Sequence, residues 1–190
     1  MSVLGVILAR GGSKRVPGKN LRLLANQSLL VWAIGCGMCC EEIDDLVVSS
    51  DDEAILDEAR RYVPTIRRPP EMATDEASPY PAMLHALDET GSYDLLCLLQ
   101  PTSPFRAVED VTACIEMCAL GDFPAVASAE DGVIAPNGAV YVAWTDWLRD
   151  GGNFDGPAVG RYYMPEWRSL DIDTEADFDR ACQMVGQYAA

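Results

Sequence analysis

The chain has 190 residues, which is enough for one domain with a continuous core, and we expect that domain to span residues 1–190. Its 30 acidic residues outnumber its 14 basic residues, and the net charge of −16 argues against nucleic acid and against an anionic membrane surface as partners. No apolar stretch reaches the length of a membrane-spanning helix, and the N-terminus runs into a predicted strand, so a cytoplasmic location is expected.

Strand and helix patterns alternate along the whole chain, which predicts an α/β fold with a mainly parallel mixed sheet. Apolar runs predict strands at residues 3–9, 45–50, 65–66, 94–99, 125–129, 138–143 and 162–164. Helical patterns cover residues 29–40, 53–62, 81–87, 108–120 and 175–187. The expected N-cap of the second helix is Asp51 or Ser50, and that of the last helix is Asp173 or Thr174.

The seven cysteines and the single histidine, His85, do not form a recognisable catalytic or metal-binding pattern. Cys36 and Cys39 have the spacing of half a zinc or redox site, but no second Cys or His pair completes it. We therefore expect buried, reduced thiols. Without a nucleophile elbow near His85, the sequence also argues against a hydrolytic triad.

The loop at residues 10–20, which follows the first predicted strand, combines glycines with cations. Five of the 14 basic residues fall between Arg10 and Arg22. Glycines let backbone N–H groups approach phosphate oxygens, and the cations supply the compensating charge. The spacing matches neither a P-loop, because Asn20 follows Gly18-Lys19, nor the dinucleotide fingerprint. We expect a nucleoside triphosphate here, and the alternative is a solvated turn.

Other candidate residues also follow strands, where ligands bind in open α/β sheets. They lie in the long loop at residues 68–78, in the turn at residues 100–106 and in the segment 171–173. On an extended segment, Asp171 and Asp173 project to the same side while Ile172 points into the core. Two carboxylates opposite a cationic loop predict a Mg²⁺ site that takes further ligands from phosphates. The alternative is that they cap the last helix, for which Asp171 lies too far upstream. Together these residues predict phosphoryl-group transfer without a protein nucleophile.

Five segments in order resemble the acylneuraminate cytidylyltransferase (CMP-sialic acid synthetase) family. They are residues 7–20, 48–52, 68–75, 99–106 and 171–177. The resemblance implies a Rossmann-like three-layer α/β/α nucleotidyltransferase fold. It also implies Mg²⁺-dependent attack by the anomeric hydroxyl of a 2-keto sugar acid on the α-phosphate of CTP, with release of pyrophosphate, in surface glycan biosynthesis.

The resemblance also implies roles for single residues. The nucleotide-binding residues would be Ala9, Arg10, Gly11, Gly12, Ser13, Lys19, Asn20, Arg68, Ala77 and Ser78. The catalytic residues would be Arg10, Lys19, Gln100, Asp171 and Asp173, of which Asp171 and Asp173 hold Mg²⁺. Gln100, Asn137 and Tyr141 would contact the sugar.

The chain departs from the family at residues 130–135, where sialic acid enzymes carry an extended insertion that forms the dimer contact and grips the neighbouring subunit's sugar. A shortened member of this kind is not expected to form the family's swapped dimer, and its oligomeric state stays open. The acceptor also stays open among legionaminic, pseudaminic and Kdo-like acids or another small acid. Arg106, Arg161 and Arg168 could still meet its carboxylate. The alternatives are a non-catalytic nucleotide-binding domain and a sugar-1-phosphate nucleotidyltransferase.

Overall fold

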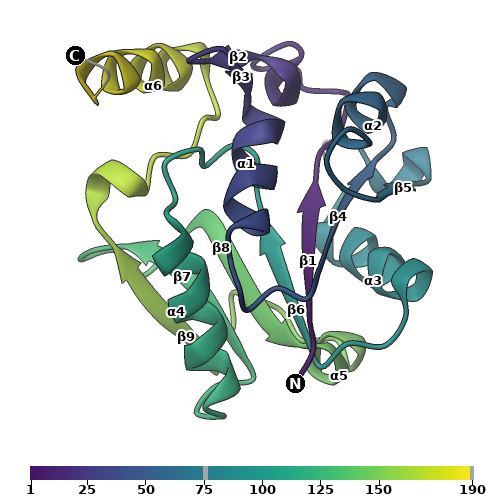
Figure 1. Ribbon diagram of the computed structural model, residues 1–190. Helices are drawn as coiled ribbons and strands as arrows, with labels where there is room; N and C mark the ends of the chain where they lie inside the picture. Colours follow the sequence, from purple (N-terminus) through teal and green to yellow (C-terminus); the bar gives the residue numbers. More distant parts are fainter. Residues whose placement is uncertain (75–76, 189–190) are drawn as a thin grey trace.

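The computed structural model describes residues 1–74 and 77–188, so Asp75 and Glu76 of the predicted loop lie outside the described residues. Within this part of the chain, a seven-stranded sheet has the order β5-β4-β1-β6-β8-β7-β9 (Figure 1). The strands are β1 (Val3–Leu8), β4 (Asp45–Ser50), β5 (Thr65–Arg67), β6 (Leu95–Leu99), β7 (Ala125–Glu130), β8 (Pro136–Trp144) and β9 (Val159–Met164). Strand β8 is antiparallel to β6 and β7, and the other neighbouring pairs are parallel. The prediction of a mainly parallel mixed sheet is confirmed.

Helices cover both faces of the sheet and give the three layers that the resemblance implies (Figure 1). One face carries α1 (Leu29–Met38), α2 (Glu53–Ala59) and α4 (Val108–Ala119), and the other carries α3 (Pro79–Thr90) and α5 (Thr145–Arg149). At the upper end of the view in Figure 1, α6 (Glu175–Tyr188) lies beside a two-stranded ribbon of β2 (Leu23–Leu24) and β3 (Gln27–Ser28). None of the helices in the described part of the chain combines the length and apolar character that crossing a bilayer requires.

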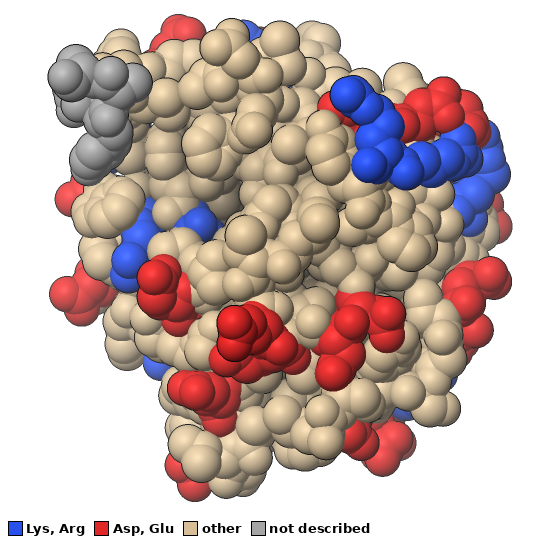
Figure 2. Space-filling model, in the orientation of Figure 1, with Lys and Arg blue, Asp and Glu red and all other residues tan. Residues whose placement is uncertain are grey.

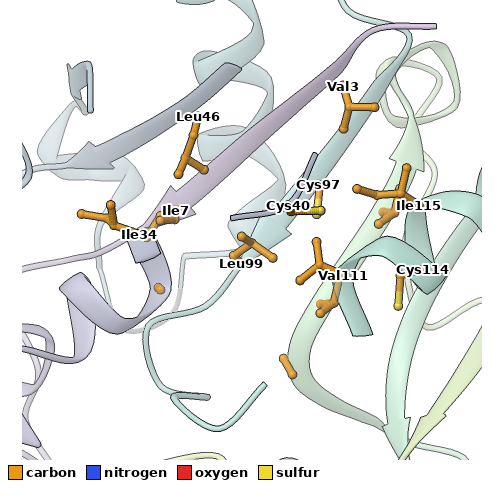
Figure 3. Packing of buried hydrophobic residues seen from close by; sticks show 14 of the residues in the cluster. Val3, Ile7, Ile34, Cys40, Leu46, Cys97, Leu99, Val111, Cys114 and Ile115 are labelled. Atoms are coloured by element: carbon orange, nitrogen blue, oxygen red, sulfur yellow. The ribbon is translucent and has the colours of Figure 1, made fainter. Parts of the chain in front are cut away.

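Apolar side chains on both faces of the central strands explain why these strands are nearly continuous apolar runs in the sequence. In β1, Ile7 faces the α1 and α4 layer, whereas Leu4 faces the α3 layer. Figure 3 shows Ile7 beside Ile34 of α1, and Leu99 of β6 beside Val111 of α4. The sheet is therefore held from both sides, and this fixes the positions of its strand ends.

Several short elements differ from the sequence-based expectations. The ribbon β2-β3 and the five-residue α5 were not predicted. Strand β9 begins at Val159, three residues before the predicted start, and it includes Gly160. A Cβ at Gly160 would lie 2.7 Å from Cδ2 of Phe123, so close packing of the strand requires glycine here.

The cap of α2 is Asp52, and the prediction of Asp51 or Ser50 was wrong. Oδ1 of Asp52 accepts a hydrogen bond from the Ile55 N–H at 3.1 Å, while Oγ of Ser50 accepts one from the Asp52 N–H. Asp51 is therefore available for another role.

The cap of α6 is Thr174, one of the two predicted residues. Thr174 Oγ1 accepts from the Asp177 N–H at 3.3 Å, and Asp177 Oδ2 accepts from the Thr174 N–H at 2.7 Å. This reciprocal capping box starts the helix without Asp173 as its cap.

The seven cysteines are free thiols, as expected. Cys40, Cys97, Cys114 and Cys118 are buried, and burial raises the pKa of each of these thiols. The expectation of burial was wrong for Cys39 and Cys182, which are exposed. Cys39 lies in the last turn after α1, beyond the helix face that packs on the sheet.

A buried arginine, Arg106, ties the ends of β6 and β8 together. Its side chain donates hydrogen bonds from Nη1 to the carbonyl oxygen of Gln100 at 2.9 Å and to that of Ala139 at 2.7 Å. Arg106 is only 5% exposed. The clamp sets the spacing between the turn after β6 and the first part of β8.

We predict that Arg106→Met lowers the free energy of unfolding by about 2–4 kcal/mol, because two carbonyl groups lose a charged donor in a buried setting. Urea denaturation measures the loss. The matched control is Arg149→Met. Arg149 forms an ion pair with Asp88, and because these side chains are 46% and 62% exposed, the pair should contribute less than about 1 kcal/mol to the free energy of unfolding. Equal losses for the two variants would contradict the clamp.

Candidate functional site

A cavity of about 280 Å³ opens at the carboxyl ends of β1 and β6. The chain order reverses here, because β4 lies on one side of β1 and β6 on the other, and such a point is where α/β sheets bind ligands. Nine of the residues proposed from the sequence line this cavity, namely Arg10, Ser13, Lys19, Asn20, Arg68, Ala77, Ser78, Gln100 and Asp173. Residues more than 150 positions apart in the chain therefore meet in one place.

The loop between β1 and the short helix η1 (Lys19–Leu21), which we call the phosphate loop, is folded back on itself. Asn20 is buried, and its side-chain Nδ2 donates to the carbonyl oxygen of Arg10 at 2.9 Å. Gly18 adopts a left-handed φ of 63°, which favours glycine, at the point where the loop turns into η1. A neighbouring cavity of about 240 Å³ is lined by Arg10, Ser13, Lys14, Arg15, Lys19 and Asp173. The cations predicted from the sequence thus line two neighbouring cavities that share Arg10, Ser13, Lys19 and Asp173.

The acidic surface makes this group of cations distinctive. Figure 2 shows one face with acidic side chains spread over its lower half and basic side chains gathered mainly at the upper right, over α2. Around α2, Glu53 forms ion pairs with Arg60 and with Arg67. Cations of the phosphate loop, by contrast, line a cavity that is suited to an anion.

Three predicted nucleotide-binding residues do not line the cavity. Ala9 is fully buried beneath it, and nothing lies within 4 Å of a Cβ built on Gly12. The backbone N–H of Gly11 donates to Oδ1 of Asp51 at 3.1 Å, so this group already has an acceptor. The side chains of Arg10, Ser13 and Lys19 are therefore the parts of this loop that face the cavity.

The loop after β5 supplies the opposite wall. The side chain of Arg68 is 5% exposed, and burial lowers the pKa of its guanidinium, while Asp51 raises it and Arg10 lowers it further. Ser78 caps α3 by accepting from the Tyr80 N–H at 3.4 Å. Ala77 precedes this cap, so the start of α3 places both residues at the cavity.

The segment before α6 places the predicted metal ligands next to the phosphate loop. Ile172 is fully buried, as predicted, and its N–H donates to the carbonyl oxygen of Thr102 at 2.8 Å. Lys19 Nζ donates to the carbonyl oxygen of Ile172 at 2.7 Å and to Asp173 Oδ1 at 3.2 Å. Arg15 Nη2 lies 3.1 Å from Asp173 Oδ2. Asp173 therefore already faces two cations of the phosphate loop.

Asp171 lies beside Gln100 rather than on the lining of the cavity. Burial raises the pKa of its carboxyl, against an opposing effect of the Thr102 hydroxyl. A Cβ built on Gly138 would lie 3.4 Å from Asp171 Oδ2 and 3.8 Å from Gln100 Oε1, and Gly138 has a φ of 83°. Glycine at this position leaves space between two hydrogen-bond acceptors at the edge of the site.

The residues fit a magnesium ion only if a ligand completes its coordination. In residues 1–74 and 77–188, no cluster of three or more His, Cys, Asp or Glu side chains is placed to hold a metal. Asp171 Oδ1 is buried and has no hydrogen-bond partner among the described residues. The negative charge of Asp173 is close enough to contribute to the raised pKa of Asp171. Mg²⁺ commonly takes one or two carboxylates and completes its shell with water and substrate phosphates, so this pair is compatible with it.

The two further residues proposed for sugar contact have internal contacts. Oδ1 of Asn137 accepts from Ser128 Oγ at 2.7 Å, and Nδ2 donates to Ser169 Oγ at 3.0 Å, at the point where the β7–β8 register shifts. Tyr141 packs against Phe154 with the rings tilted by 58° and their centroids 4.9 Å apart, and burial raises the pKa of its phenol to about 12. Asn137 shapes the bulge that presents Gly138, and Tyr141 stands as a neutral phenol beside Asp171.

The three arginines that could meet an acceptor carboxylate all have partners within the chain. Arg106 forms the clamp described above. Arg161 donates to the carbonyl oxygens of Ile134 and Phe154, and Arg168 pairs with the buried Asp110 at 3.0 Å. Each holds neighbouring segments of the chain together.

Sequence reasoning missed several residues of the site. Thr102 borders both Gln100 and Asp171, and Met72, Thr74 and Leu98 also line the cavity. The signal for Thr102 was its position directly after a predicted strand, within a segment already singled out. Met72 and Thr74 belong to the loop at residues 68–78, and Leu98 belongs to a predicted strand, but the sequence does not show that these residues face the cavity.

Comparison with known proteins agrees with this geometry. A family model described as "Cytidylyltransferase" matches residues 4–136. A CMP-N,N'-diacetyllegionaminic acid synthase from Legionella pneumophila is 41% identical over 127 residues, which cover 62% of this chain and 53% of that protein. An N-acylneuraminate cytidylyltransferase from Escherichia coli is 28% identical, over 94% of this chain and 51% of its own length.

A solved structure of a CMP:2-keto-3-deoxy-manno-octonic acid synthetase complexed with CTP superposes with a TM-score of 0.82 over 99% of this chain and 100% of that chain. At 14% identity, this likeness confirms the nucleotidyltransferase fold. The chain spans about half the length of the curated relatives that it matches. The family model covers most of the present chain, from β1 to the start of β8, and the family inferred from five sequence segments is confirmed. The chain belongs to the cytidylyltransferase family.

Proposed function

We propose that this chain transfers CMP from CTP to the anomeric hydroxyl of a 2-keto sugar acid with release of pyrophosphate, in the biosynthesis of surface glycans. The observation that carries the proposal is the cavity that brings the phosphate loop, Arg68, Gln100 and Asp173 together at the reversal point of the sheet. Its cations suit a triphosphate, and its carboxylates suit a divalent cation that accompanies the triphosphate.

The nucleotide would lie between the phosphate loop and the loop after β5. Arg10 and Lys19 would contact phosphate oxygens, and Asn20 would lie near the ribose. Arg68 and the start of α3, with Ala77 and Ser78, would contact the cytosine and ribose. These assignments are supported by the fact that all six residues line the same cavity. Backbone groups there can discriminate among bases, because a wrong base leaves buried polar groups unpaired.

The reaction is a substitution at phosphorus. The anomeric hydroxyl loses its proton to solvent as its oxygen forms a bond to the α-phosphorus of CTP. The bond from that phosphorus to the bridging oxygen breaks, its electron pair stays on that oxygen, and pyrophosphate leaves. Arg10 and Lys19 would stabilise the charge on the phosphates, while Gln100 would orient the acceptor. Asp171 and Asp173 would hold Mg²⁺, which when bound supplies positive charge to the phosphate oxygens.

N,N'-diacetyllegionaminic acid is the first acceptor to test, because it is the acid named for the relative with 41% identity. The other acids to test are N-acetylneuraminic acid, pseudaminic acid and Kdo, which share the 2-keto acid group. A short turn of five residues joins β7 to β8, so an acceptor has no long β7–β8 arm to contact in this chain.

We predict that pyrophosphate release requires CTP, a divalent cation and one of these acids. The measurement is a coupled pyrophosphate assay with CTP, UTP, ATP and GTP against the four acids, with and without EDTA. Release that depends on CTP and on one acid would support the proposal. CTP binding without release for any acid would favour the non-catalytic alternative, and release with a sugar 1-phosphate would favour the third alternative.

We predict that Asp173→Ala lowers turnover roughly 100-fold or more, because it removes a carboxylate from the metal site. The fold should be retained, since the Asp173 side chain is 44% exposed and its ion pairs are worth less than about 1 kcal/mol. Thermal unfolding and steady-state rates test both statements. Asp179→Ala is the matched control, because Asp179 is exposed on α6 away from the cavity lining. Near-normal turnover in Asp173→Ala would refute the metal assignment.

A further inference from the structure

Asp51 is an acidic residue that faces two loops of the site at once. It follows directly after β4, between the ends of β1 and β5. Its Oδ1 accepts the Gly11 N–H at 3.1 Å and lies 3.9 Å from Nη2 of Arg68. One carboxylate oxygen thus connects the phosphate loop with the loop after β5.

The surroundings of Arg68 explain why a negative charge is needed there. The side chain of Arg68 is 5% exposed, and that of Asp51 is 23% exposed. Burial and the neighbouring Arg10 both disfavour the charged form of Arg68, whereas Asp51 favours it. Two guanidinium groups on one cavity repel each other, and the carboxylate behind them offsets this repulsion.

We propose that Asp51 is a positioning residue for the nucleotide site, which holds Arg68 and the phosphate loop in the arrangement that binds CTP. This inference rests on the proposed function. Asp51 is not among the residues that line the cavity, so it acts through Arg68 and Gly11. The cap of the following helix is provided by Asp52, which leaves the carboxylate of Asp51 to the two loops.

The two contacts of Asp51 differ in kind, so a substitution can remove its charge and keep its hydrogen bond. At 3.9 Å, the contact with Arg68 is electrostatic and too long for a hydrogen bond, whereas the contact with Gly11 is a hydrogen bond. Asp51→Asn keeps an acceptor for the Gly11 N–H and removes the charge that faces Arg68. Asp51→Glu keeps the charge.

The test is isothermal titration of CTP with Mg²⁺ into the chain and its variants. We expect Asp51→Asn to weaken CTP binding by roughly tenfold, because a buried arginine loses its counter-charge, and Asp51→Glu to retain binding within about threefold. Asp52→Asn is the matched control. Asparagine caps a helix as well as aspartate does, so this variant should bind CTP like the unaltered chain.

A double-mutant cycle with Arg68→Met distinguishes positioning from a general structural effect. If Asp51 acts through Arg68, Asp51→Asn should weaken binding little further in the Arg68→Met background. Thermal unfolding of each variant reports the fold separately from binding. Unchanged CTP affinity in Asp51→Asn would overturn the inference, and so would an equal loss of affinity in the two backgrounds.

The outcome for the unaltered chain separates this inference from the proposed function. If the unaltered chain does not bind CTP, the proposed function fails and the inference fails with it. If it binds CTP and Asp51→Asn binds equally well, only the positioning role fails.

Discussion

The site depends on the fixed positions of three strand ends. Strand β1 lies between β4 and β6, and the loops that follow these three strands form the phosphate loop, the Asp51 turn and the Gln100 turn. Because both faces of the sheet are packed against helices, the strand ends cannot shift separately without opening the core. Polar contacts then join the segments that follow these strands. The Arg106 clamp connects β6 to β8, and the Ile172 N–H donates to the carbonyl oxygen of Thr102. Under the proposed function, this packed frame would keep the groups that act on the phosphates in fixed relative positions.

Charge balance is the second feature that unites the site. Lys19 and Arg15 face Asp173, and Arg68 faces Asp51, so the cations of the site are held against carboxylates within the protein. These contacts limit the repulsion among cations that gather on one cavity. A triphosphate that enters would offer Lys19 a stronger partner than Asp173. The carboxylate released by that exchange would then be available to a divalent cation, so nucleotide and metal binding would assist each other under the proposed function.

Features that depend on neighbouring residues in the sequence could be predicted, whereas features that depend on contacts between distant segments could not. The strands β1, β4 and β6 are buried on both faces, and their apolar runs revealed them without tertiary information. The ribbon β2-β3 and the helix α5 are too short to have a pattern, and the Gly160 start of β9 depends on Phe123 from another segment. The site residues that face the cavity came from local motifs. The internal roles of Arg106, Arg161 and Arg168 were missed, because a sequence shows that an arginine is present but not which distant carbonyl or carboxylate it meets.

The internal contacts of Arg106, Arg161 and Arg168 bear on how an acidic acceptor would be held. A carboxylate beside Gln100 would approach Asp171, and two negative charges at short distance oppose each other. A divalent cation held by Asp171 and Asp173 would supply positive charge that offsets this repulsion. Under the proposed function, the acid would therefore bind favourably only after the nucleotide and its metal ion. The space that Gly138 leaves between Gln100 and Asp171 would, under the proposed function, place an acceptor hydroxyl where it can donate a hydrogen bond to one of these two acceptors.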